Sequence, residues 1–200
     1  MSDLQDIIIS KTRVKMLELF FLNSDEMFYV RDISRRTKEQ VNAVRRELDR
    51  LLGTGLLKSE ERGNRLYYNL NKRYPYYQEI LQMVVKSTGL GKKIRRYRRK
   101  LGKLEYVMFS GKYTSGITPA KDEVDMIFVG DLVLSELKEL IKTQEEQIGR
   151  EINYAVFSLE EFEFRKTRRD PFVLDILYGS RVMVIGNEID FTNRQIPGIA

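Results

Sequence analysis

The clearest pattern in this chain of 200 residues lies between Arg36 and Asn71, where the sequence is RTKEQVNAVRRELDRLLGTGLLKSEERGNRLYYNLN. Its first half repeats apolar residues with the spacing of one helix face, at Val41, Val44, Leu48, Leu51 and Leu52. Thr37 and Gln40, three residues apart, fit a capping box, and glycines follow the last apolar pair. The sequence therefore predicts a helix that begins at about Thr37 and ends between Gly53 and Gly55.

The segments on either side of this helix extend the pattern. After it, β-prone runs at 56–60 and 66–70 enclose the turn residues Gly63 and Asn64, which predicts a hairpin. Before it, apolar residues at helical spacing predict a helix over 11–22. A β-prone stretch at 28–30 and a short helix over about 31–36 complete the expected order.

The outward face of the helix after Thr37 carries polar side chains that can reach base edges and phosphates. Gln and Asn pair with adenine, and Arg pairs with guanine or with the backbone. The candidate DNA-binding residues are Lys38, Gln40, Asn42, Arg45 and Arg46 on this face, with Arg62 and Arg65 at the hairpin tip. Carboxylates also lie near this face, at Glu39, Asp49, Glu60 and Glu61.

In this order and spacing, the segment 36–71 resembles a winged helix-turn-helix of the ArsR and MarR type of repressor. The resemblance implies binding to double-stranded DNA, and the two-fold symmetry of operators favours a homodimer. A winged helix that contacts proteins instead of DNA is the alternative. The helix expected after the hairpin, with Ile80, Leu81, Val84 and Val85, could pair with its copy in a dimer or pack on the helix 11–22.

The charge of the chain is concentrated in one short segment. Residues 1–89 hold 16 basic and 12 acidic side chains, residues 90–103 hold 8 and none, and residues 104–200 hold 11 and 17. In the middle segment, Ile94, Tyr97 and Leu101 predict a helix docked by a thin apolar stripe. This basic run could extend a nucleic-acid footprint, offset the acidic domain that follows, or form a solvated connector. We therefore expect three regions: a winged helix over 1–72, connector helices over 73–103, and a further domain over 104–200.

The region 104–200 predicts an α/β layer. Strands are expected at 104–109, 126–130, 151–157 and 181–185, with helices over 133–147 and from about Ser158. A loop at 110–119 follows the first strand. The fold class expected for the whole chain is α+β, with a mixed sheet in the second domain.

The strand, the glycine loop and the acidic pair of this region resemble the nucleotidyltransferase superfamily. That resemblance implies that Gly111 and Lys112 hold a nucleotide and that Glu123 and Asp125 bind Mg²⁺. Hard oxygen ligands suit that ion, and side chains two apart on a strand point the same way. The whole chain is similar to predicted transcriptional regulators that join these two domains.

Three departures from the superfamily pattern weigh against catalysis. Lys112 replaces the usual Ser, Glu123 replaces the first Asp, and Asn153 stands where a third carboxylate is expected. A neutral amide does not activate a hydroxyl. Glu151 could substitute for the third carboxylate, and Lys112 could bind a phosphate or pair with Glu123 in place of a metal.

Three candidate functions follow from these residues and resemblances. We expect a dimeric DNA-binding transcriptional regulator whose inactive transferase-like domain serves sensing or assembly, with no certain cofactor. The alternatives are a Mg²⁺-dependent nucleotidyltransferase that uses Glu123 and Asp125, and an antitoxin-like protein that binds a protein partner. The absence of Cys and His excludes disulfides, thiolate chemistry and the usual zinc sites. Short apolar runs and an acidic start predict a cytoplasmic protein without a membrane segment.

Overall fold

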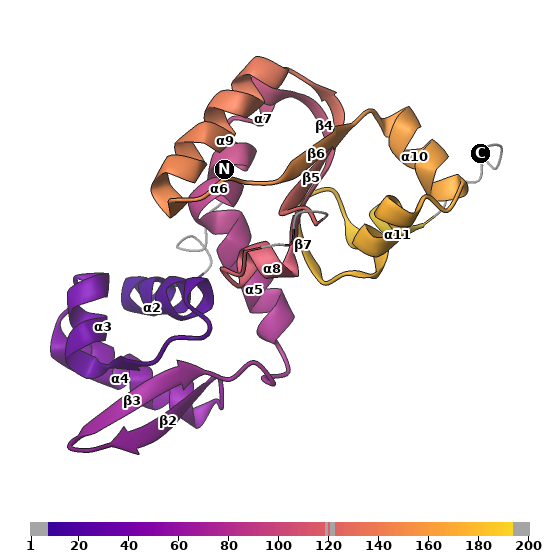
Figure 1. Ribbon diagram of the computed structural model, residues 1–200. Coiled ribbons are helices and arrows are strands. Elements are labelled where there is room, and N and C mark those ends of the chain that lie inside the picture. Colours follow the sequence, from indigo (N-terminus) through magenta and orange to yellow (C-terminus); the bar gives the residue numbers. More distant parts are fainter. Residues whose placement is uncertain (1–7, 119, 121–122, 194–200) are drawn as a thin grey trace. The chain divides into compact units, whose positions relative to one another are not determined.

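The protein is an α+β chain with two separate sheets, shown in Figure 1. The computed structural model describes residues 8–118, 120 and 123–193. The chain divides into two compact units, with the boundary between Thr88 and Gly89. This boundary lies inside the segment 73–103 that the sequence marks as a connector.

Unit 1 follows the order of elements expected from its sequence. The elements are α2 (Lys11–Leu22), β1 (Phe28–Tyr29), α3 (Val30–Thr37), α4 (Val41–Gly53), β2 (Leu57–Arg62), β3 (Arg65–Leu70) and α5 (Tyr77–Ser87). The strands form an antiparallel sheet in the order β1-β3-β2. Gly63, with a φ of 60°, and Asn64 connect β2 to β3, because a two-residue hairpin turn needs a residue that tolerates positive φ.

The core of unit 1 is built from the apolar faces of α2, α3 and α4. Its fully buried side chains include Phe20 and Phe21 of α2, Ile33 of α3 and Leu48 of α4. Phe28 of β1 packs edge-on against Phe20, with ring centroids 5.5 Å apart. The helical periodicity of the sequence therefore identifies most of these buried faces, but Val41, the first apolar residue of the stripe predicted for α4, is 36% exposed.

The predicted capping box at Thr37 is wrong. Thr37 is the last residue of α3, and its hydroxyl donates to the carbonyl of Ile33 at 2.7 Å. Lys38 then takes a left-handed conformation with a φ of 56°, which turns the chain sharply. Consequently α4 begins at Val41, and its N-cap Gln40 makes no side-chain capping bond.

The helix after the hairpin packs within its own unit. Leu81, Val84 and Val85 of α5 are buried, and the Tyr77 ring lies 5.3 Å from that of Phe21 in α2. Of the two arrangements expected for this helix, packing on α2 is therefore present.

Unit 2 is built around a mixed sheet, as expected. Its elements are α6 (Gly89–Arg96), α7 (Arg98–Leu101), β4 (Gly102–Ser110), α8 (Gly111–Thr114), β5 (Met126–Leu132), α9 (Leu134–Ile148), β6 (Tyr154–Phe157), α10 (Leu159–Thr167), α11 (Pro171–Tyr178), β7 (Arg181–Ile185) and α12 (Glu188–Thr192). The strand order is β6-β5-β4-β7. β5 and β6 are parallel, and the other pairs are antiparallel.

Helices cover both faces of this sheet. In Figure 1, α9 with α6 and α7 lies on one side, and α10 with α11 lies on the other. Alternate residues of β4 and β5, such as Met108 and Ile127, join a core with Phe162, Val173 and Phe191. Burial on both faces explains why β4 and β5 are nearly continuous apolar runs.

Two expectations about unit 2 are wrong in detail, and two of its helices had no prediction. The basic run is not one helix, because the chain breaks at Tyr97 between α6 and α7. The strand β6 begins at Tyr154, so Glu151 and Asn153 precede it. The helices α11 and α12 were not expected, although Asp170 and Asn187 cap their first turns with side-chain bonds. Among the described residues, no helix combines the length and the apolar character needed to cross a membrane.

Candidate functional site

The exposed face of α4 brings together most of the predicted DNA-binding residues. Val44, Leu48 and Leu51 are buried against the core, which fixes the rotation of the helix about its axis. As a result Asn42, Arg45, Arg46 and Asp49 face outward. Lys38 and Gln40 are also exposed, in the turn that leads into α4.

A buried carboxylate on the opposite side of α4 ties this helix to α2. Glu47 is only 5% exposed. It accepts hydrogen bonds from the Ser10 hydroxyl at 3.0 Å, from Arg13 Nε at 2.9 Å and from Arg50 Nη1 at 3.1 Å. Burial alone would raise the pKa of Glu47, but the bonds from Arg13 and Ser10 outweigh it and the pKa is lowered.

Glu39, which the sequence placed near the DNA-facing surface, is bound by residues of α2. Its carboxylate accepts from Lys15 Nζ at 2.6 Å and from the Thr12 hydroxyl at 3.0 Å. These bonds lower the pKa of Glu39, so it is ionised and its charge is paired at neutral pH. The negative charge of Glu39 is thus compensated locally.

The cations of the exposed face are not compensated in this way. Lys38, Arg45 and Arg46 have no ion-pair partner in the part of the chain that the structure describes. The carboxylates Glu39 and Glu47 pair with Arg13, Lys15 and Arg50 instead. The outer face of α4 and its preceding turn therefore carry net positive charge, with Asp49 as the exposed acidic residue of the helix.

The hairpin β2–β3 holds the other two predicted residues in different environments. Arg62 pairs with Glu60 on the same strand, at 3.0 Å between Nε and Oε1. Arg65 lies over the Tyr29 ring, with its Cζ 4.8 Å from the ring centroid. Tyr29 belongs to β1, so this contact connects the hairpin to the third strand of the sheet. Both arginines are exposed, whereas Glu60 partly offsets the charge of Arg62.

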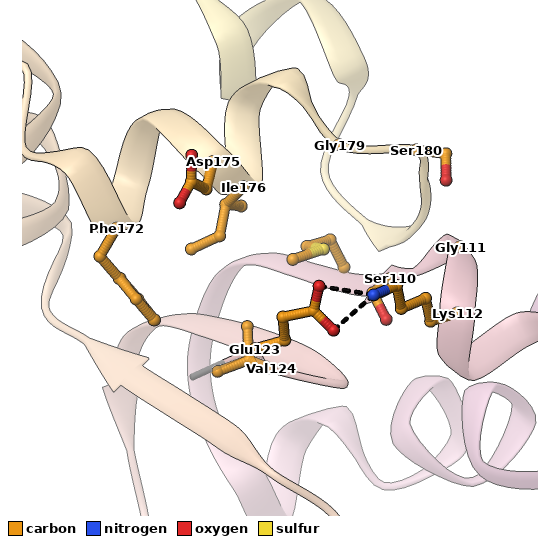
Figure 2. A pocket seen from close by; sticks show the side chains of 11 residues that line it. Ser110, Gly111, Lys112, Glu123, Val124, Phe172, Asp175, Ile176, Gly179 and Ser180 are labelled. Carbon is orange, nitrogen blue, oxygen red and sulfur yellow. Dashed lines mark hydrogen bonds and ion pairs between the residues drawn. The ribbon is translucent and has the colours of Figure 1, made fainter. Parts of the chain in front are cut away.

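The residues proposed for nucleotide binding line a small pocket in unit 2, shown in Figure 2. Its volume is about 290 Å³. Ser110 caps α8, with its hydroxyl accepting from the Tyr113 backbone N–H at 3.1 Å, and Gly111 follows at the first position of that helix. A Cβ on Gly111 would lie 2.0 Å from the Ser180 hydroxyl, so the close approach of these segments requires glycine there. Residues of α11, among them Phe172 and Asp175, form the facing wall.

Lys112 pairs with Glu123 across this pocket. Its Nζ lies 2.5 Å from both carboxylate oxygens, as Figure 2 shows, and the backbone N–H of Ala120 donates to the same carboxylate. These contacts lower the pKa of Glu123. Of the two roles expected for Lys112, pairing with the carboxylate is therefore present. Pro119, Lys121 and Asp122 of the preceding loop lie outside the described residues.

The second carboxylate, Asp125, is also held by a cation. Its side chain is 0% exposed. Arg150 donates Nη1 to Oδ2 at 2.8 Å and Nη2 to Oδ1 at 2.9 Å, and the Asn153 backbone N–H donates to Oδ2 at 3.0 Å. A bidentate pair of this kind is strong because both oxygens are engaged. The burial of Tyr113, together with the negative charge of Asp125, raises the pKa of Tyr113 to about 12.

This geometry does not fit a resident divalent ion. Such an ion needs several hard oxygen ligands, whereas each oxygen of Asp125 already accepts a bond from a guanidinium. Within residues 8–118, 120 and 123–193, no three Asp or Glu side chains come together as a candidate metal site. Asn153 is exposed, and its side-chain amide donates to the backbone carbonyl of Glu123 at 3.4 Å.

Arg150 and Glu47 organise these sites, and neither is among the site residues predicted from the sequence. Asp125 directly precedes the apolar run 126–130, and a buried carboxylate in such a place requires a charged or hydrogen-bonding partner. Burial of Asp125 therefore predicts a cationic partner, but it does not identify Arg150, which lies 25 residues away. Glu47 falls on the buried side of the predicted helix, and a carboxylate at such a position indicates a buried ion pair.

Comparison with known proteins gives weak likenesses only. No family model matches the chain, and no curated protein sequence matches it. Reduced HlyU from Vibrio cholerae is similar over 44% of this chain and 77% of its own, with 18% identity and a TM-score of 0.31. Human N-acetylserotonin methyltransferase in complex with SAM is similar over 86% of this chain, with 12% identity and a TM-score of 0.30; the chain spans 44% of that protein. Scores this low carry no argument about function.

Proposed function

We propose that this protein is a DNA-binding transcriptional regulator and that unit 1 is its winged helix-turn-helix. One observation carries the proposal. The exposed face of α4 presents Asn42 beside the uncompensated cations Arg45 and Arg46, while Glu39 and Glu47 are paired toward α2. This arrangement gives α4 the polar and cationic surface that a helix needs in a major groove.

The proposed roles follow from the position of each residue. α4 lies in the major groove, where Asn42 and Gln40 contact adenine edges and Arg45 and Arg46 contact guanines or phosphates. Lys38, in the turn before α4, contacts the phosphate backbone of the DNA. Arg65 and Arg62 of the hairpin reach phosphates or the adjacent minor groove.

The affinity of α4 variants for a duplex selected from a random pool tests this proposal. Each lost base or phosphate contact costs about 1–3 kcal/mol, so Arg45→Ala with Arg46→Ala should weaken binding by roughly 100-fold. Fluorescence anisotropy with a labelled duplex measures the change. Lys138→Ala with Lys142→Ala, on the exposed surface of α9, removes the same charge and should leave the affinity within about twofold.

Equal losses in the two double variants would show that only net charge matters and would contradict a specific role for α4. A wild-type protein that selects no duplex would remove the proposal altogether.

We also propose that the protein binds DNA as a homodimer. One winged helix contacts one half-site, and a two-fold axis doubles the contacts without new residues. The selected duplex should then contain an inverted repeat, and light scattering of the complex should give two chains per duplex. A single non-repeated site bound by one chain would contradict this.

For unit 2 we propose sensing or assembly rather than nucleotidyl transfer. The supporting observation is the bidentate pairing of Asp125 with Arg150, together with the pairing of Glu123 with Lys112. Incubation with labelled nucleoside triphosphates and Mg²⁺ tests the proposal, and we expect no labelled product. Transfer that disappears in Asp125→Asn would contradict it and restore the transferase alternative.

A further inference from the structure

The basic run lines a hollow in unit 2 that no role assigned so far uses. The hollow lies between α6, α7 and α9, and its volume is about 620 Å³. Ligand pockets usually measure about 300–1,000 Å³, so this hollow is of ordinary size for a small molecule, whereas the pocket beside Glu123 is at the lower limit. Residues of α6 and α7 line it together with residues of α9.

Four cations line one wall of the hollow. Lys92, Lys93 and Arg96 belong to α6, and Lys100 belongs to α7. Lys93 donates to the side-chain oxygen of Gln147 at 3.2 Å. Arg96 and Lys100 are exposed and have no ion-pair partner among the residues that the structure describes. This wall therefore attracts a ligand with more than one negative charge.

The break between α6 and α7 adds an aromatic ring to the same wall. Ile94 and Leu101 are buried in the core, whereas Tyr97 is 41% exposed. Arg96 Cζ lies 5.7 Å from the centroid of the Tyr97 ring, and Lys100 Nζ lies 5.8 Å from it. A partly exposed ring with two cations beside it can stack on a planar group whose phosphates the cations bind.

The part of the lining that comes from α9 carries two carboxylates. Glu136 and Glu139 are exposed and line the hollow, as do Leu140 and Thr143 of the same helix. Carboxylates repel phosphate but accept hydrogen bonds from hydroxyl or amino groups, such as those of a ribose or a base. The hollow is thus suited to a ligand with anionic and hydrogen-donating ends. The repeating phosphates of a single strand would meet the two carboxylates, so the lining favours a discrete nucleotide.

We propose that this hollow binds a nucleoside di- or triphosphate. Arg96 and Lys100 bind its phosphates, the Tyr97 ring stacks on its base, and Glu136 and Glu139 accept bonds from its hydroxyl or amino groups. The site is separate from the pocket around Gly111 and Lys112, since the two share no lining residue. It also goes beyond DNA binding, because none of its residues belongs to unit 1.

Calorimetric titration of the full chain with ATP and with GTP tests this proposal. A chelator in the buffer prevents any metal-dependent binding beside Asp125. We expect at least one nucleotide to bind, Arg96→Ala with Lys100→Ala to weaken it by about tenfold or more, and Tyr97→Leu to weaken it by about three- to tenfold. Lys138→Ala with Lys142→Ala, which replaces exposed residues of α9 that do not line the hollow, should leave the affinity unchanged. Unaltered thermal unfolding shows that each variant is folded.

Two additional probes separate this site from other anion sites. Tripolyphosphate should bind more weakly than the nucleotide and should be insensitive to Tyr97→Leu, because it has no ring to stack. Absence of nucleotide binding, or binding unchanged in the hollow variants, would overturn the proposal. The proposal would also be overturned if a single-stranded oligonucleotide bound far more tightly than either nucleotide and the same variants abolished that binding. The hollow would then be a binding site for single-stranded nucleic acid.

Discussion

Glu47 is the residue on which the presentation of α4 depends most. It joins Ser10 and Arg13 of the α2 segment to α4 from a buried position, so its loss changes the support of the exposed face. Glu47→Gln keeps the shape and removes the charge, and we expect it to lower the free energy of unfolding of unit 1 by about 1–3 kcal/mol. Urea unfolding measures this. Glu60→Gln, which removes an exposed partner of Arg62, should cost less than about 1 kcal/mol.

The same carboxyl makes the stability of unit 1 depend on pH. Its pKa in the folded chain is lowered from the ordinary 4.5. The unfolded chain therefore binds the proton first as the pH falls, and the stabilisation present above pH 4.5 is lost as the pH falls through the folded pKa. Wild type should lose more stability on acidification than Glu47→Gln. Parallel losses in the two proteins would contradict a contribution from Glu47.

At the scale of elements, the sequence predicts what periodicity controls and misses what single contacts control. The faces of α2 and α4 follow from the repeat of apolar residues, because burial sets that repeat. The start of α4 was misplaced because Thr37 bonds back to Ile33 instead of capping forward. The sequence also does not predict the break at Tyr97, because Ile94 and Leu101 have the spacing of one continuous helix and are both buried. Neither the bond of Thr37 nor the break at Tyr97 changes the spacing of apolar residues in the sequence.

The outward face of α4 combines sequence recognition and charge, and one substitution can separate them. Asn42→Ala removes a group that can hydrogen-bond a base edge but leaves the charge unchanged. We expect discrimination among base pairs at one position of each half-site to fall by about 1–3 kcal/mol, with little change in the salt dependence. Competition with single-substitution duplexes measures this. Uniform weakening on every duplex would contradict a base contact.

At the scale of the whole molecule, each unit has its own core and its own buried ion pair. Glu47 with Arg13 stabilises unit 1, and Asp125 with Arg150 stabilises unit 2. Sequence periodicity anticipated the order of most elements in both units. It could not anticipate these pairs, because their partners lie 34 and 25 residues apart and depend on the folded arrangement.

Breaking the pair in unit 2 should act on that unit alone. Arg150→Met leaves the fully buried carboxylate of Asp125 without its cation, which we expect to cost about 3 kcal/mol. Hydrogen exchange should become faster in β5 and β6 while α2 and α4 keep their protection. Arg165→Met, which breaks pairs with Glu161 and Asp170 that are more exposed than the pair of Asp125 with Arg150, should have a smaller effect. Loss of protection spread equally over both units would contradict separate cores.

The central claim is that the cations on the exposed face of α4 contact DNA, and the salt dependence of duplex binding tests it most directly. Each phosphate contact contributes about −0.9 to the slope of log K against log salt concentration. If Arg45 and Arg46 each contact a phosphate, replacing both by Ala should reduce the magnitude of the slope by about two, while Lys138→Ala with Lys142→Ala should leave it unchanged. An unchanged slope and affinity in the Arg45 and Arg46 variant would contradict the claim.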